Sequence, residues 1–172
     1  MRLMLTTPTY RPEVHKDSSC GSVVLAALLE MSTQEADMWM DLYAKKGWNG
    51  YTNVSHIRTV CEKRGIKMNL IKPHKPDFIP PSHHPMAVFV QMKGPWERKG
   101  WRSAYSYTHW ALCIQGMILD INSVLERGRH DPRPEWTNEE TWRFTVLAHL
   151  ADSIKDCNGF KVRAVYEFVG AT

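Results

Sequence analysis

Long apolar stretches and a secretion signal are both missing from this sequence. None of its 172 residues belongs to an apolar run approaching about 18 residues, the length that a membrane helix needs. The N-terminal segment MRLMLTTPTYRPEVHKD has no apolar core and no small-residue cleavage site. We therefore expect no membrane partner and a cytoplasmic location.

Cysteine pairs and regular metal-ligand spacings are also missing. The four cysteines are far apart and form no CxxC motif: Cys20, Cys61, Cys113 and Cys157. Disulfide frameworks and structural zinc sites have recognisable cysteine spacings, so we expect neither here. His74, His83 and His84 lie in a proline-rich loop without such spacing. We expect no metal and no cofactor.

Positive charge is present but is not gathered into a run. The chain has 22 Lys and Arg against 18 Asp and Glu, with a formal net charge of +4 and a pI of about 8.9. Scattered basic residues are typical of a solvated surface rather than of a nucleic-acid-binding stripe. We expect no nucleic-acid partner, and the oligomeric state stays open.

The composition is that of a folded globular protein. Hydrophobic residues make up 43% of the chain and charged residues 23%. The length allows one sizeable core and is short for two ordinary domains. The sequence has no internal repeat and no low-complexity segment, so we predict a single domain over residues 1–172.

Helical patterns occupy the first part of the chain. Residues 21–31, GSVVLAALLEM, are apolar on nearly all sides and predict a buried helix. The capping box STQE opens a second helix over residues 36–46, and Asn53 caps a third helix that ends at Gly65.

The second part of the chain favours β structure. Residues 86–92 are a continuous apolar run of strand length, which predicts a central strand. A capping box between Thr137 and Glu140 predicts one more helix over residues 137–151. The remaining predicted strands are residues 66–71, the hairpin 107–122 and residues 161–169. Helices followed by antiparallel strands indicate an α+β fold.

Cys20 is the candidate nucleophile. It follows Ser18 and Ser19, whose hydroxyls can cap a helix, so we expect it at a helix start. The unpaired N–H groups there stabilise a thiolate, and a neighbouring imidazolium does so further. Gly21 would leave room for a substrate backbone. A cysteine in this position can also be inert packing, so the assignment depends on the downstream hairpin.

The hairpin brings a histidine and two possible partners to one face. A two-residue turn at the QG pair would place Ala111 opposite Asp120 and His109 opposite Asn122. Because side chains alternate along strands, the His, Asp and Asn share a face. A base held in one tautomer in this way can deprotonate a thiol. Singly, His109 could be a core histidine and Asp120 a loop cap, but the combination favours catalysis.

The order of these motifs resembles the papain-like cysteine peptidases. SSCG at a helix start, THWAL on a strand and ILDIN on the next strand follow the element order of that superfamily over about residues 10 to 123. The pattern is most like the domains that cut leader peptides from bacteriocin precursors and small cysteine-peptidase-like proteins of bacteria and phages. The resemblance implies that Cys20 is the nucleophile, His109 the general base and then acid, and Asp120 the residue that orients His109.

Two roles of that family are less clearly filled. The family has a Gln shortly before the cysteine that donates to the oxyanion, and this chain has Val14 at that position. His15 could supply a donor instead. Asn122 is an alternative orienter because it lies opposite His109 in the expected register, whereas Asp120 fits the family's spacing better. We favour Asp120.

A basic and aromatic loop over residues 93–106 precedes the strand of the candidate histidine. Trp96 and Trp101 stand among lysines and arginines in this loop. Such a loop could stack on nucleobases, but long loops beside a site more often contact the substrate. We therefore expect Trp96 and Trp101 to form a substrate-binding rim.

These features predict a cysteine-dependent hydrolase, either a peptidase or an isopeptidase or amidase, acting on a peptide or protein. Acyl transfer by the same groups stays open. The alternative is a weak or inactive papain-like scaffold that binds and modulates another protein, for example a phage protein acting on a host protein. The missing Gln supports this alternative, and the cytoplasm would then be that of the host.

Overall fold

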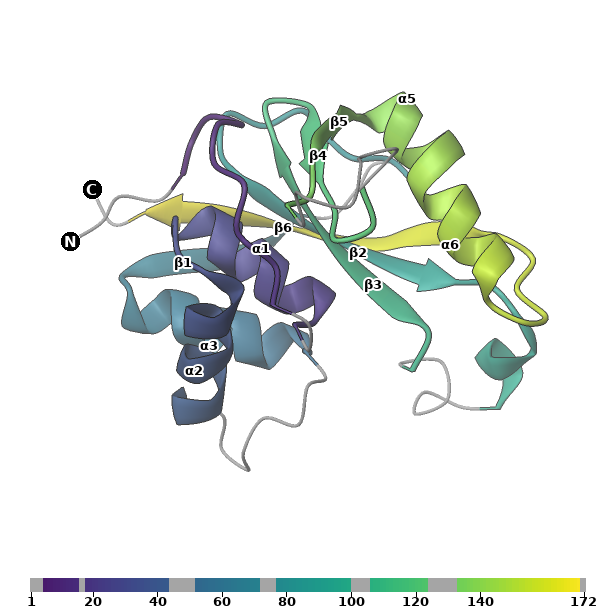
Figure 1. Ribbon diagram of the computed structural model, residues 1–172, viewed down its shortest axis with the longest axis horizontal. Coiled ribbons are helices and arrows are strands. Elements are labelled where there is room, and N and C mark those ends of the chain that lie inside the picture. Colours follow the sequence, from purple (N-terminus) through teal and green to yellow (C-terminus); the bar gives the residue numbers. More distant parts are fainter. Residues whose placement is uncertain are drawn as a thin grey trace.

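An antiparallel sheet runs through the centre of the molecule (Figure 1). The computed structural model describes residues 5–15, 18–43, 52–71, 77–99, 106–123 and 133–170. Within these residues the strand order is β1-β6-β2-β3-β4-β5, and every neighbouring pair is antiparallel. The strands are β1 Ile66–Ile71, β2 Met86–Met92, β3 Thr108–Ile114, β4 Met117–Leu119, β5 Trp136–Asn138 and β6 Phe160–Gly170.

Three helices lie on one side of this sheet (Figure 1). They are α1 Cys20–Leu28, α2 Thr33–Tyr43 and α3 Val54–Lys63. All residues of α1 after Cys20 are buried, because α1 lies between α2 and β3. This burial explains its apolar pattern on all sides. In the described ranges, no helix combines the length and the apolarity that a bilayer crossing requires.

A second helical layer covers the opposite side of the sheet (Figure 1). It consists of α5 Glu139–Thr141, the π-helical stretch η2 Trp142–Leu147 and α6 Ala148–Ser153. Side chains from β2 pack into both layers, Phe89 toward α1 and Val88 and Val90 toward Trp142. Strand β2 is therefore buried on both faces, and the predicted central strand is confirmed.

The predicted α+β arrangement, with N-terminal helices packed on an antiparallel sheet, is confirmed. Two of the predicted helix starts carry the expected caps. The side chain of Ser19 accepts from the backbone N–H of Ser22 at the start of α1. Asn53 Oδ1 accepts from the N–H of His56 at 3.1 Å at the start of α3. Local polar side chains thus fix where these helices begin.

The predicted capping box between Thr137 and Glu140 is wrong. Thr137 lies in β5 opposite Ile118, and its hydroxyl donates to the Ile118 carbonyl at 3.3 Å. The helix cap is Asn138, whose Oδ1 accepts from the N–H of Thr141 at 2.8 Å. Pairing with β4 keeps Thr137 in the extended conformation, so the helix begins after Asn138 instead.

Candidate functional site

Cys20 is the first residue of α1 and is half-buried. Ser19 Oγ accepts from the N–H of Ser22 at 3.2 Å, and Ser22 Oγ accepts from the N–H of Ser19 at 3.2 Å. Two serines therefore close the first turn as a reciprocal capping box. The thiol lies at the helix end where the dipole is positive, as expected from the sequence.

Gly21 has a packing role that differs from the one expected. A Cβ atom at Gly21 would lie 2.3 Å from Thr52 Cγ2, and Gly21 itself is buried. The interpretation that this glycine leaves room for a substrate backbone is therefore wrong. Its missing side chain lets Thr52 approach the first turn of α1.

The β3–β4 hairpin has the predicted turn. Gln115 and Gly116 have φ angles of 51° and 78°, as a two-residue type I′ turn requires. Ile114 lies opposite Met117, which is the expected register. Strand β4 ends at Leu119, however, and the next residues turn, so the expected pairing of His109 with Asn122 is wrong.

His109 and Asp120 form a buried ion pair. His109 Nε2 lies 2.8 Å from Asp120 Oδ2, and the two side chains are 7% and 0% exposed. Burial would lower the pKa of His109, but the Asp120 carboxylate and the Cys20 side chain raise this pKa well above 6.5. Burial would likewise raise the pKa of Asp120, but the charge and hydrogen bond of His109 lower it below 3.8. The pair is thus held in its ionised form.

The thiol, the imidazole and the carboxylate are brought together from distant parts of the chain. A hydrogen bond with the Cys20 side chain is among the interactions that raise the pKa of His109. Because Nε2 of His109 faces Asp120, Nδ1 is the ring nitrogen left for Cys20. His109 therefore lies between the Cys20 thiol and the Asp120 carboxylate. The catalytic roles of these residues stay predictions.

Trp142 contributes to this site, and the sequence did not indicate it. Trp142 Nε1 donates to Asp120 Oδ2 at 2.8 Å, the same oxygen that faces His109. Trp142 is fully buried at the start of η2, far from the hairpin in the sequence. The sequence pattern indicated only a core residue on a helix, because no spacing rule connects Trp142 to the hairpin.

The two alternative residues lie in other positions. Asn122 is exposed, and its backbone N–H donates to Asp120 Oδ1 at 2.8 Å. His15 is also exposed, its N–H donates to Thr33 Oγ1 at 2.8 Å, and its charge acts on Asp37. Among the described residues, no hydrogen bond links His15 to Cys20. Its role as an oxyanion donor stays a prediction.

The expected aromatic rim is described only in part, because Trp101 lies outside the described residues. Trp96, in the 3-10 helix η1 Pro95–Arg98, is 6% exposed and stacks on Tyr107 with ring centroids 3.9 Å apart. Its Nε1 donates to the Met92 carbonyl at 2.8 Å. Trp96 is therefore largely buried and anchors the loop. A hollow of about 450 Å³ beside it is lined by Pro95, Trp96, Lys99, Ser106, Tyr107, Lys155 and Asp156.

The buried cysteines are poor candidates for a nucleophile. Burial raises the pKa of the Cys61 thiol to about 12. Burial also raises the pKa of Cys113, to about 11. Such thiols are protonated at neutral pH and react slowly. In the described part of the chain, no group of three His, Cys, Asp or Glu side chains could hold a metal ion.

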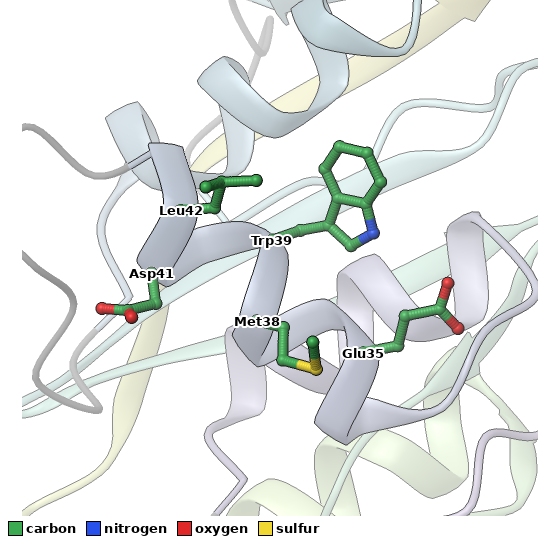
Figure 2. A pocket seen from close by; sticks show the side chains of 5 residues that line it. All are labelled: Glu35, Met38, Trp39, Asp41 and Leu42. Carbon is green, nitrogen blue, oxygen red and sulfur yellow. The ribbon is translucent and has the colours of Figure 1, made fainter.

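A separate hollow of about 510 Å³ lies on the outer face of α2 (Figure 2). Met38 and Leu42 are 66% and 70% exposed there. Glu35, Trp39 and Asp41 complete its lining, and Figure 2 shows that all five side chains extend from α2. This hollow therefore includes none of the candidate catalytic residues.

No protein-family model matches the sequence, and no curated protein is significantly similar to it. Among solved structures, the chain is similar to the peptidase domain of Streptococcus ComA, described as a bi-functional ABC transporter involved in a quorum sensing pathway. The identity is 14% and the TM-score 0.39, over 94% of this chain and 98% of that one. Similarity at this level assigns neither a fold family nor an activity.

Proposed function

We propose that the protein is a cysteine-dependent hydrolase of peptide or amide bonds, with the papain-like arrangement that its sequence motifs resemble. Cys20 is the nucleophile, His109 the general base and then acid, and Asp120 the residue that orients His109. The observation that carries this proposal is the buried His109–Asp120 pair beside a cysteine at a helix N-terminus. Residues with strongly shifted pKa values are concentrated at functional sites.

The first half of the reaction forms an acyl-enzyme. The proton that Cys20 gives up already lies on Nδ1 of His109 when the substrate binds, so Sγ attacks the carbonyl carbon of the substrate as a thiolate. Asp120 at Nε2 stabilises the resulting imidazolium. The N–H of Cys20 at the helix start donates to the oxyanion. His109 then protonates the leaving amine, the C–N bond breaks, and a thioester to Cys20 remains.

The second half restores the enzyme. His109 takes a proton from water, and the hydroxide oxygen attacks the thioester carbon. The C–S bond breaks, the carboxylic acid product leaves, and the Cys20 thiolate beside protonated His109 is restored. Another nucleophile in the place of water would give acyl transfer with the same residues.

A peptidyl vinyl sulfone tests this function, because it alkylates thiolates that a histidine activates. We expect an adduct on Cys20, located by peptide mass spectrometry, that disappears in His109→Ala. Cys157 is also half-buried and serves as the internal control. Equal labelling of Cys20 and Cys157, or labelling of Cys20 that persists in His109→Ala, would contradict the proposed function.

A further inference from the structure

A chain of hydroxyl groups joins Asp37 on α2 to the first turn of α1. Ser22 Oγ donates to Asp37 Oδ1, and Ser18 Oγ donates to Asp37 Oδ2 at 3.3 Å. Ser22 Oγ lies 2.9 Å from Ser19 Oγ, which lies 2.8 Å from Thr52 Oγ1. Ser22 and Thr52 are 0% and 4% exposed. These groups form one connected network at the first turn of α1.

The charge of Asp37 sets the direction of this network. Each hydroxyl has a single proton to donate. Since Ser22 donates to Asp37, Ser19 is the donor to Ser22. Thr52, which also faces the Met40 sulfur at 3.7 Å, is then the donor to Ser19. A carboxylate at the end of such a chain strengthens each bond in it.

The same network reaches the strand of the candidate histidine. The Thr52 carbonyl accepts from Trp110 Nε1 at 3.1 Å, and Trp110 follows His109 in β3. Thr52 also fits closely against Gly21. The turn that carries Cys20 and the strand that carries His109 are therefore joined through Thr52.

We propose that Asp37 is a positioning residue for Cys20: its carboxylate holds Ser22, and through it the first turn of α1, where the Cys20 sulfur meets His109. The proposal rests on the proposed function, because the Cys20–His109 contact is what Asp37 maintains. Burial raises the pKa of Asp37, while hydrogen bonds from Ser22 and Ser18 and the charge of His15 oppose that rise. The serines thus help to keep the carboxylate ionised in this half-buried position.

The Asp37→Asn variant separates positioning from simple electrostatics. A negative charge near a thiol disfavours its thiolate, so removing the charge alone would make Cys20 more reactive. Loss of positioning acts in the opposite direction, because a displaced nucleophile loses its contact with His109. The sign of the change in Cys20 reactivity therefore identifies the role of Asp37.

The experiment measures iodoacetamide alkylation of each cysteine by peptide mass spectrometry from about pH 5 to about pH 9. The variants are Asp37→Asn, Ser22→Ala, the double variant and His109→Ala. Asp41→Asn is the matched control, because Asp41 lies on the exposed face of the same helix. Cys61 and Cys113 report unfolding, because both thiols are buried in the native protein.

We expect Asp37→Asn and Ser22→Ala each to slow Cys20 alkylation on the acid side by about tenfold or more, with Cys61 and Cys113 still protected. The double variant should be no slower than the slower single variant, because both changes break the same hydrogen bond between Ser22 and Asp37. Asp41→Asn should match the wild type.

Three results would overturn the proposal. In the first, Asp37→Asn is as fast as the wild type or faster. In the second, Cys61 and Cys113 become labelled together with the loss at Cys20, which assigns Asp37 to global stability. In the third, the two single effects add in full. An unchanged rate in His109→Ala is a different result, which overturns the proposed function itself.

Discussion

At the scale of single residues, Asp120 is where the hydrogen bonds of the site meet. Its Oδ2 faces His109 Nε2 and accepts from Trp142 Nε1, both at 2.8 Å. Its Oδ1 accepts from the N–H of Asn122 at 2.8 Å. Burial alone would raise the pKa of Asp120, but the charge of His109, followed by the hydrogen bonds from His109, Trp142 and Asn122, lowers it.

The variant Trp142→Phe keeps an aromatic ring and removes one of these donors. The Trp142 hydrogen bond contributes to the lowered pKa of Asp120. Loss of this bond raises that pKa and weakens the ion pair between Asp120 and His109. We expect a loss of about 1–3 kcal/mol in the free energy of unfolding, measured with urea, and slower alkylation of Cys20. Slower alkylation is the readout that a packing role alone would not give.

Trp136→Phe is the matched control for that variant. Trp136 Nε1 donates to the neutral carbonyl of Tyr10 at 3.1 Å in a partly buried position. We expect a loss of about 0.5–1.5 kcal/mol and an unchanged alkylation rate at Cys20. If both variants changed that rate equally, Trp142 would have no particular connection to the site.

At the scale of elements, the first turn of α1 depends on a glycine that helix propensity disfavours. Alanine is about 1 kcal/mol better than glycine inside a helix, so Gly21→Ala would stabilise an exposed helix. Here the new Cβ would lie 2.3 Å from Thr52 Cγ2. We expect a net loss of about 1–3 kcal/mol in urea unfolding, together with slower Cys20 alkylation. Unchanged or higher stability would show that Thr52 moves aside freely.

Elements that depend on local signals were predictable from the sequence. The cap at Asn53 and the QG turn of the hairpin act within a few residues, so the sequence carries the whole signal. Elements whose ends depend on contacts with residues far away in the sequence were not predictable in this way. Strand β5 exists because Trp136–Asn138 pairs with β4, and this pairing displaced the expected helix cap from Thr137 to Asn138.

The same distinction applies to the candidate site. Cys20 and His109 were predicted from a helix start and a hairpin, and Asp120 was preferred to Asn122 because its spacing fits the family that the motifs resemble. Trp142 and Thr52 were missed, because they reach the site from other layers of the molecule.

Burial is a further property that sequence spacing does not give. Trp96 was expected at a rim because its loop precedes the strand of His109 in the sequence, but its indole is buried against Tyr107.

At the scale of the whole molecule, the site joins the two hydrophobic clusters on opposite sides of the sheet. Cys20 packs with the cluster under α1, whereas Trp142 belongs to the cluster under η2 and α6. The ion pair of His109 and Asp120 contacts both Cys20 and Trp142 and is buried. Ionisation of the site and stability of the fold are therefore linked.

This linkage predicts a stability that falls at both ends of the pH range. The pKa of His109 is raised in the folded state, so its contribution is complete below 6.5 and is lost as the pH rises toward the raised value. The pKa of Asp120 is lowered, so its contribution is complete above 3.8 and is lost as the pH falls below that value.

Urea unfolding across this pH range checks the prediction. In His109→Ala the decline above about pH 6.5 should disappear, because the titrating imidazole is gone. A decline of the same size in the wild type and in this variant would assign the pH dependence to other groups.

The most direct test of the proposed hydrolase is the alkylation rate of Cys20 against pH in the wild type and in His109→Ala. An activated pair predicts fast alkylation well below about pH 8.5, where an ordinary thiol ionises, and loss of this reactivity in the variant. Identical curves for the two proteins, rising only near the pH of an ordinary thiol, would contradict the Cys20–His109 pair and the hydrolase function built on it.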